Sequence, residues 1–141
     1  MIDQKTAPYA ALVLRVTLGV MYLAHGLYLK LFVFGMAGTA QFFGSLGLPE
    51  VLAYAVVAGE TFGGLALIIG FQTRLVAVGL MPVLLGALWV HGGNGWVFSG
   101  QGGGWEFPLF LIAASAVQGL LGNGAYALSP KGETVVVQAA Q

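Results

Sequence analysis

Apolar residues fall into four long runs, separated by short segments that are polar or rich in glycine. Each run has about 17–22 residues, and a helix of that length, at ~1.5 Å per residue, is long enough for the ~30 Å hydrocarbon core of a bilayer. The pattern predicts transmembrane helices over residues 8–29, 49–70, 73–90 and 105–121. The expected fold class is all-α: a polytopic membrane protein in which residues 1–141 form one four-helix bundle.

Two features are predicted outside the regular spans. Residues 39–47 can form a short amphipathic helix in the membrane interface, with Thr39 as its N-cap and Gly47 at its end. In the third span, Pro82 predicts a kink, because proline removes a backbone hydrogen bond and clashes with the preceding turn.

Composition supports lipid as the main solvent of the surface. Hydrophobic residues make up 58% of the chain and charged residues only 7%, whereas a soluble domain usually has about 25% charged residues. The absence of cysteine excludes disulfides, iron–sulfur clusters, thiolate metal sites and covalently attached c-type haem. The formal net charge is zero and there is no basic tract, so nucleic acid is not an expected partner.

The distribution of cations predicts the orientation. Four crossings place Lys5, Arg74 and Lys131 on one side of the membrane and Lys30 on the other. Cytoplasmic loops carry the excess of lysine and arginine, so both termini are expected to be cytoplasmic. Three tryptophans then lie at the outer interface: Trp89, Trp96 and Trp105.

Three polar side chains are expected deep in the membrane, on three different helices: Arg15, Glu60 and Gln118. Burying such a charge in lipid costs ~2.5–3.5 kcal/mol, so these residues should face the bundle interior and pair with one another. Tyr22 shares a helical face with Arg15. The pair Gly59-x-x-x-Gly63 is a small-residue packing motif. Helices can approach closely at such a motif, which would let Arg15 meet Glu60.

Two interpretations of an Arg15–Glu60 pair remain open. It is a structural ion pair that fixes helix register, or it belongs to a polar pocket that binds a head group or relays protons. Nearer the outer face, His25 and His91 could together ligate a b-type haem; otherwise His25 hydrogen-bonds to a neighbouring helix and His91 is an interfacial residue. Lys30 is interpreted as a cation that extends to the interface. No metal site is predicted, and no nucleophile–base pattern marks a catalytic residue.

Two sequence blocks resemble the DoxX family. The first extends from Arg15 to His25-Gly26 and is followed by Lys30, and the second extends from Gly59-Glu60 to Thr73-Arg74. The resemblance covers about the stretch 12–121. One departure is visible, because the spacing from His25 to Lys30 is one residue longer than the commoner His-Gly-x-x-Lys form.

The resemblance implies a four-helix protein of the bacterial cytoplasmic (inner) membrane. The family takes its name from a subunit associated with a thiosulfate:quinone oxidoreductase, and other members are linked to redox-stress complexes. It therefore suggests a redox or quinone connection by analogy.

Three functional hypotheses follow. The first is a membrane subunit of a redox system, with or without enzymatic activity of its own, that binds a quinone-like head group. The chain contains no recognisable redox cofactor motif, so its electrons would come from a partner or a bound cofactor. The second is a non-enzymatic structural or assembly subunit, and the third is a carrier of a small molecule or lipid. The expected partners are the bilayer and either a protein redox partner or further copies of the chain. The pocket candidates are Arg15, Tyr22, His25, Glu60, His91 and Gln118.

Overall fold

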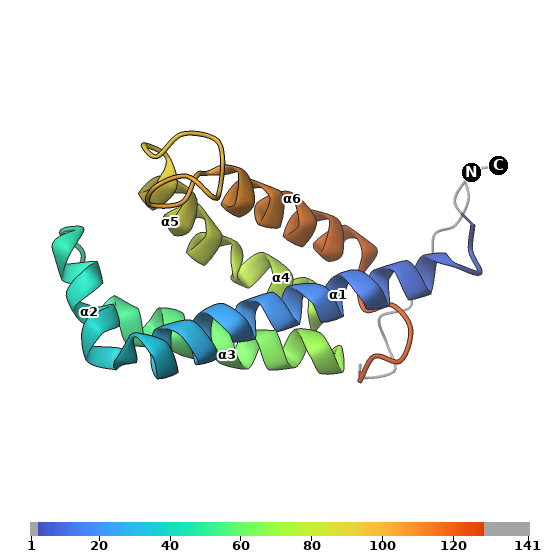
Figure 1. Ribbon diagram of the computed structural model, residues 1–141. Helices are drawn as coiled ribbons and strands as arrows, with labels where there is room; N and C mark the ends of the chain where they lie inside the picture. Colours follow the sequence, from blue (N-terminus) through green and yellow to red (C-terminus); the bar gives the residue numbers. More distant parts are fainter. Residues whose placement is uncertain (1–2, 129–141) are drawn as a thin grey trace.

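The computed structural model describes residues 3–128, and all regular structure in this part of the chain is helical (Figure 1). Seven helical segments follow one another, and several of them are joined end to end. In chain order they are α1 (Ala7–Leu23), the π-helix η1 (Ala24–Val33), α2 (Gly35–Ser45), α3 (Val51–Ile69), α4 (Thr73–Gly79), α5 (Met81–His91) and α6 (Glu106–Leu121).

These segments make a four-helix membrane bundle. Within the described residues, three helical stretches are long and apolar enough to cross a membrane: Ala7–Val33, Val51–Ile69 and Thr73–His91. The fourth helix, α6, is apolar but has only 16 residues. Side chains on the outside of the bundle are large and apolar, as lipid contact requires, and include Phe62, Leu75 and Leu120, each at least 70% exposed.

The first helix continues beyond its predicted end at residue 29. The chain passes from α1 into η1 without a break, so the helical stretch runs for 27 residues to Val33. η1 has the i→i+5 hydrogen bonding of a π-helix over ten residues, a form that is rare and usually limited to one turn. It coincides with the segment that is one residue longer than the commoner family spacing.

The short helix between the first and second spans is present, but its predicted N-cap is wrong. α2 begins at Gly35, where a φ of +71° lets the chain turn sharply after η1. Thr39 lies inside α2, and its hydroxyl donates to the Lys30 carbonyl at 2.8 Å. It therefore fastens α2 to the π-helix. The helix ends at Ser45, and Gly47 follows with a φ of +76°.

The third span is interrupted where Pro82 predicts a kink. α4 ends at Gly79, and α5 begins at Met81 with Pro82 in its first turn. Leu80 is buried in the gap between them, and a Cβ on Gly63 of α3 would lie 2.8 Å from its side chain. The predicted glycine packing motif thus accommodates Leu80 of the third span rather than Arg15.

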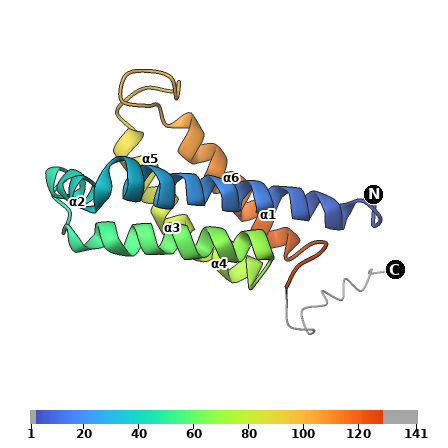
Figure 2. The ribbon, with the colours of Figure 1, turned by 60° about the horizontal axis from the view of Figure 1, so that its bottom comes forward.

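Helices α1 and α3 lie alongside each other for most of their length, as both views show (Figures 1 and 2). They are closest where Gly19 faces Gly64: a Cβ on Gly19 would lie 2.7 Å from the Gly64 carbonyl, and the reverse distance is 2.8 Å. Arg15, Gly19, Tyr22 and Gly26 are all buried. The predicted shared face is therefore the face that packs into the bundle.

The two ends of the bundle differ. At one end, the turn between α3 and α4 meets the segment after α6, where Leu128 N–H donates to the Ile69 carbonyl and Ala125 N–H to the Pro8 carbonyl. At the other end lie α2 and the long loop between α5 and α6 (Figure 1). In that loop, Trp96 packs against Trp105 with ring centroids 4.6 Å apart. Lys131, used to predict orientation, is outside the described residues.

Candidate functional site

A cavity of about 390 Å³ lies in the half of the bundle that contains α2 and the α5–α6 loop. The α5–α6 pair diverges from the α1–α3 pair toward this end (Figure 1), and side chains from both pairs, from η1 and from α2 line the space. Most of the lining is apolar and aromatic. The lining side chains that carry a nitrogen or oxygen atom come from α1, η1, α3 and α5: Tyr22, His25, Lys30, Glu60, Trp89 and His91.

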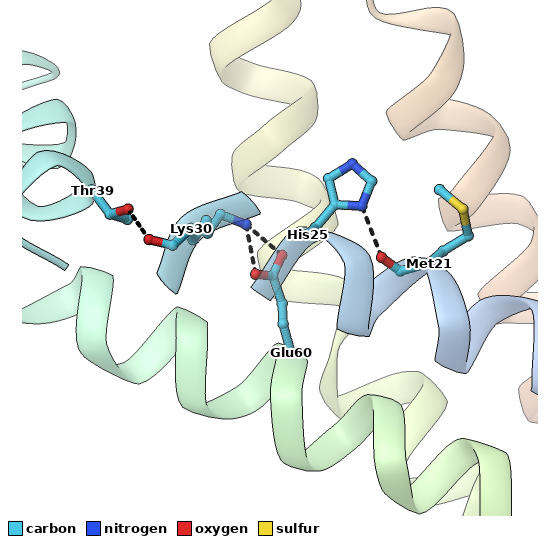
Figure 3. A network of polar contacts seen from close by, with 5 residues as sticks. All are labelled: Met21, His25, Lys30, Thr39 and Glu60. Atoms are coloured by element: carbon cyan, nitrogen blue, oxygen red, sulfur yellow. Dashed lines mark hydrogen bonds and ion pairs between the residues drawn. The ribbon is translucent and has the colours of Figure 1, made fainter. Parts of the chain in front are cut away.

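An ion pair between Lys30 and Glu60 forms part of the cavity wall (Figure 3). The Lys30 ammonium donates to both carboxylate oxygens of Glu60, at 2.6 Å each. The Glu60 side chain is 6% exposed and that of Lys30 is 23% exposed. The Glu60 side chain is thus almost fully buried, while part of the Lys30 side chain, which lines the cavity, remains accessible. An ammonium has three N–H donors, so one can still serve a ligand.

Gly26 makes this pair possible. A Cβ at Gly26 would lie 2.6 Å from Cβ of Glu60 and 3.2 Å from the Thr61 backbone nitrogen. The π-helix therefore approaches α3 at the residue that carries the carboxylate. This close approach lets the short Glu60 side chain pass beside η1 and reach Lys30.

The interpretation of Lys30 as a cation that extends to the interface is wrong, because the structure pairs it with Glu60. In an α-helix, residues five apart are separated by ~140° around the axis, at ~100° per residue. In a π-helix the hydrogen bonds join residues five apart, so His25 and Lys30 come close to the same side. The added residue in this segment is accommodated by the π-helix, and Lys30 still faces α3 and the cavity.

His25 and Tyr22 lie beside this pair on the same helical stretch. The Nδ1 of His25 donates to the Met21 carbonyl at 2.8 Å (Figure 3), because a carbonyl can only accept. The ring is stacked with Phe107 of α6, with centroids 6.1 Å apart. Nε2 has no hydrogen-bond partner among the described residues, so in the neutral ring it is a proton acceptor. The Tyr22 hydroxyl lies 3.4 Å from Oγ of Ser115, which makes a weak hydrogen bond.

His91 lines the same cavity from the end of α5. Its Nδ1 lies 3.0 Å and 3.1 Å from the carbonyls of Gly102 and Gly103, and Asn94 donates to the same two carbonyls. His91 thus helps to hold the glycine-rich loop against α5. In residues 3–128 there is no group of three or more His, Cys, Asp or Glu side chains that could hold a metal ion.

The predicted Arg15–Glu60 pair is wrong. Arg15 is 1% exposed and donates to three backbone carbonyls: Leu67 at 3.0 Å, Ile68 at 2.7 Å and Ala125 at 2.8 Å. The first two belong to the last turn of α3, where the helix has used up its own donors; the Leu67 carbonyl also accepts from the Gly70 N–H at 3.1 Å. Glu60 lies seven residues before Leu67, ~10 Å away along the axis. The end of α3 was therefore within closer reach of Arg15.

Gln118 is also buried away from the cavity. Its side-chain amide donates to the Gly122 carbonyl at 2.7 Å, just beyond the end of α6. Its Oε1 has no partner among the described atoms. Of the six pocket candidates, the structure brings Tyr22, His25, Glu60 and His91 to one cavity. It adds Lys30 and leaves out Arg15 and Gln118.

Comparison with known proteins agrees with the two sequence blocks. The sequence model of the DoxX family matches residues 10–93. The chain belongs to the DoxX family. A curated relative from Bacillus subtilis (strain 168), named "Putative oxidoreductase CatD", is 37% identical over 126 residues, which cover 89% of each chain. No solved structure shows significant similarity. In this DoxX protein, the matched region contains Lys30, Glu60 and His25 but ends before α6.

Proposed function

We propose that this DoxX-family protein is an integral subunit of a quinone-linked redox system in the bacterial cytoplasmic membrane, with both ends of the chain on the cytoplasmic side. Its cavity binds a quinone-like head group. The observation that carries the proposal is the Lys30–Glu60 pair in the wall of an apolar, aromatic cavity. Apolar pockets with a few convergent polar groups are the usual form of small-molecule sites.

The polar groups suit the two oxidation states of a quinone. The third N–H of Lys30 can donate to a quinone carbonyl, while Glu60 balances the positive charge. The free Nε2 of neutral His25 can accept the hydroxyl proton of the reduced form. Phe107, which is stacked with His25, offers an aromatic face for the flat ring.

The protein would contribute binding, orientation and proton acceptance. Reduction of a quinone to a quinol consumes two electrons and two protons. A partner subunit with a flavin, haem or iron–sulfur centre would exchange the electrons, since the chain has no recognisable redox motif of its own. The name of the Bacillus relative, "Putative oxidoreductase CatD", supports this class of function.

Mass spectrometry of lipids and cofactors that co-purify in mild detergent tests the proposal. We expect stoichiometric quinone with the wild type and with Gly79→Ala, a control in which the new Cβ has open space. The double variant Lys30→Gln with Glu60→Gln keeps two polar side chains of similar size but has no charge, and should fold yet retain no quinone.

Other outcomes would redirect the proposal. If the folded wild type retains neither quinone nor haem, the result favours a structural or assembly subunit, or a carrier, over the redox subunit. If it retains haem that is lost with His25→Ala and with His91→Ala, the cavity is a haem site instead. Retention of quinone by the uncharged double variant would show that the ion pair is not part of the binding site.

A further inference from the structure

A second hollow adjoins the cavity along α1. It is a groove of about 590 Å³ between α1 and α6. Val13 on one flank and Phe110 on the other are 65% and 66% exposed, so both are at the lipid-facing surface. The groove follows α1 from Met21 down to Thr6, fifteen residues or ~22 Å of helix.

The groove and the cavity share part of their walls. Leu18, Met21 and Leu111 line both. Met21 also provides the carbonyl that holds His25. The polar half of the site and the apolar groove are thus neighbours at one turn of α1. A flexible methionine at this junction can adapt to a chain that passes between them.

We infer that this groove holds the hydrocarbon tail of the ligand whose head group occupies the cavity, which makes the ligand a long-chain isoprenoid quinone rather than a small soluble one. The inference rests on the proposed function. The head lies at Lys30 and His25, and the tail leaves past Met21 between α1 and α6 toward the end of the bundle that contains Thr6.

Physical chemistry defines what the groove contributes. Lipid chains are as apolar as the groove, so moving a tail from the bilayer into it gains little from the hydrophobic effect. The groove therefore provides room and direction more than affinity. Blocking it should exclude ligands with a tail and spare head groups without one.

Thr17→Trp tests this in nanodiscs. Thr17 is an exposed groove residue on α1, and the indole would fill the groove without entering the core. Val20→Trp is the control, because Val20 is on the same helix and 52% exposed but does not line the groove. We expect Thr17→Trp to weaken binding of a long-chain quinone by about tenfold or more, and to leave binding of a chain-free naphthoquinone unchanged.

The outcomes separate this inference from the proposed function. Equal binding of the long-chain quinone by the wild type and both variants would overturn the inference that the groove holds the tail. The proposed head-group site would be unaffected. Equal loss of both ligands in Thr17→Trp also overturns it, because the indole then acts on the head group. If the wild type binds neither ligand, both proposals fail.

Cross-linking gives a readout that does not depend on a variant. A quinone with a diazirine on its tail should label peptides from α1 and from α6 near Phe110. The cavity is also lined by Phe42 and Phe43 of α2, which offer the tail another way out. Labelling confined to α2 would overturn the inference.

Discussion

The helical stretch formed by α1 and η1 carries two cations, Arg15, which is buried, and Lys30, which is partly buried. Arg15 is 1% exposed and every partner is a backbone carbonyl, whereas Lys30 faces a carboxylate and a cavity. The first arrangement closes one end of the bundle. The second leaves a charged group where a ligand can reach it. Two charges that look alike in sequence therefore have different expected roles.

The choice of residue fits each environment. The guanidinium has five donors in a fixed fork and stays charged, so one side chain can serve carbonyls from α3 and from the segment after α6. An ammonium is a compact point charge with rotatable donors. It can satisfy Glu60 and still turn toward a ligand.

The largest expected effect on stability comes from replacing Arg15. Arg15→Met should lower the melting temperature in mild detergent strongly, because each buried acceptor left without a donor costs about 1–3 kcal/mol. Arg15→Lys should recover only part of the loss, since an ammonium cannot reproduce the fork. The protein that remains folded should retain quinone as the wild type does. An Arg15→Met variant with an unchanged melting temperature would contradict this role.

A smaller effect on stability, with loss of binding, is expected for Gly26→Ala. The new Cβ would lie 2.6 Å from Cβ of Glu60, and overpacking of this kind costs about 1–3 kcal/mol. It should also separate Glu60 from Lys30. Gly79→Ala is the matched control: it meets nothing within 4 Å and should be neutral or stabilising by up to about 1 kcal/mol. Equal melting temperatures for the two variants would argue against the close approach at Gly26.

Filling the cavity should affect binding alone. Gly86 of α5 lines the cavity, and a Cβ there would have nothing within 4 Å. Gly86→Leu should leave the melting temperature about the same, because leucine favours the helix and occupies empty space. Quinone retention measured by mass spectrometry should fall. Full retention with an unchanged melting temperature would place the ligand elsewhere.

The smallest effect is expected from removing one residue of the π-helix. Tyr28 is 63% exposed, and its deletion restores the commoner His-Gly-x-x-Lys spacing. The segment should then become α-helical, with Lys30 still facing Glu60, since residues four apart share a face of an α-helix. Quinone retention should persist, with a stability loss below that of Gly26→Ala. Loss of retention by a stable deletion variant would mean that the π-helix itself is required.

Part of the site could be predicted from sequence. Glu60 and His25 are conspicuous because ionisable groups are rare in apolar helices, and Tyr22 follows from its helical face. Lys30 is predicted to extend to the interface because it lies at the outer end of the first apolar run, and its contact with Glu60 depends on a π-helix that the sequence pattern does not indicate. The partners of Arg15 cannot be predicted in this way, because they are backbone carbonyls. Every residue has a backbone carbonyl, so no residue type indicates which ones Arg15 contacts.

That this chain is a helical membrane bundle follows from its residues alone, because unbroken apolar runs of this length cross lipid as helices, whereas the strands of a barrel alternate apolar and polar residues. The position of Pro82 inside the third apolar run also indicates where that span is interrupted, since a proline in a helix interior removes a backbone hydrogen bond. Which charges pair follows only from how the helices pack against one another. Pairing depends on where helices cross and on their register. Here the close approach of Gly26 to α3 brings the two helices together at Glu60. The π-helix, with its one added residue, sets the register of Lys30.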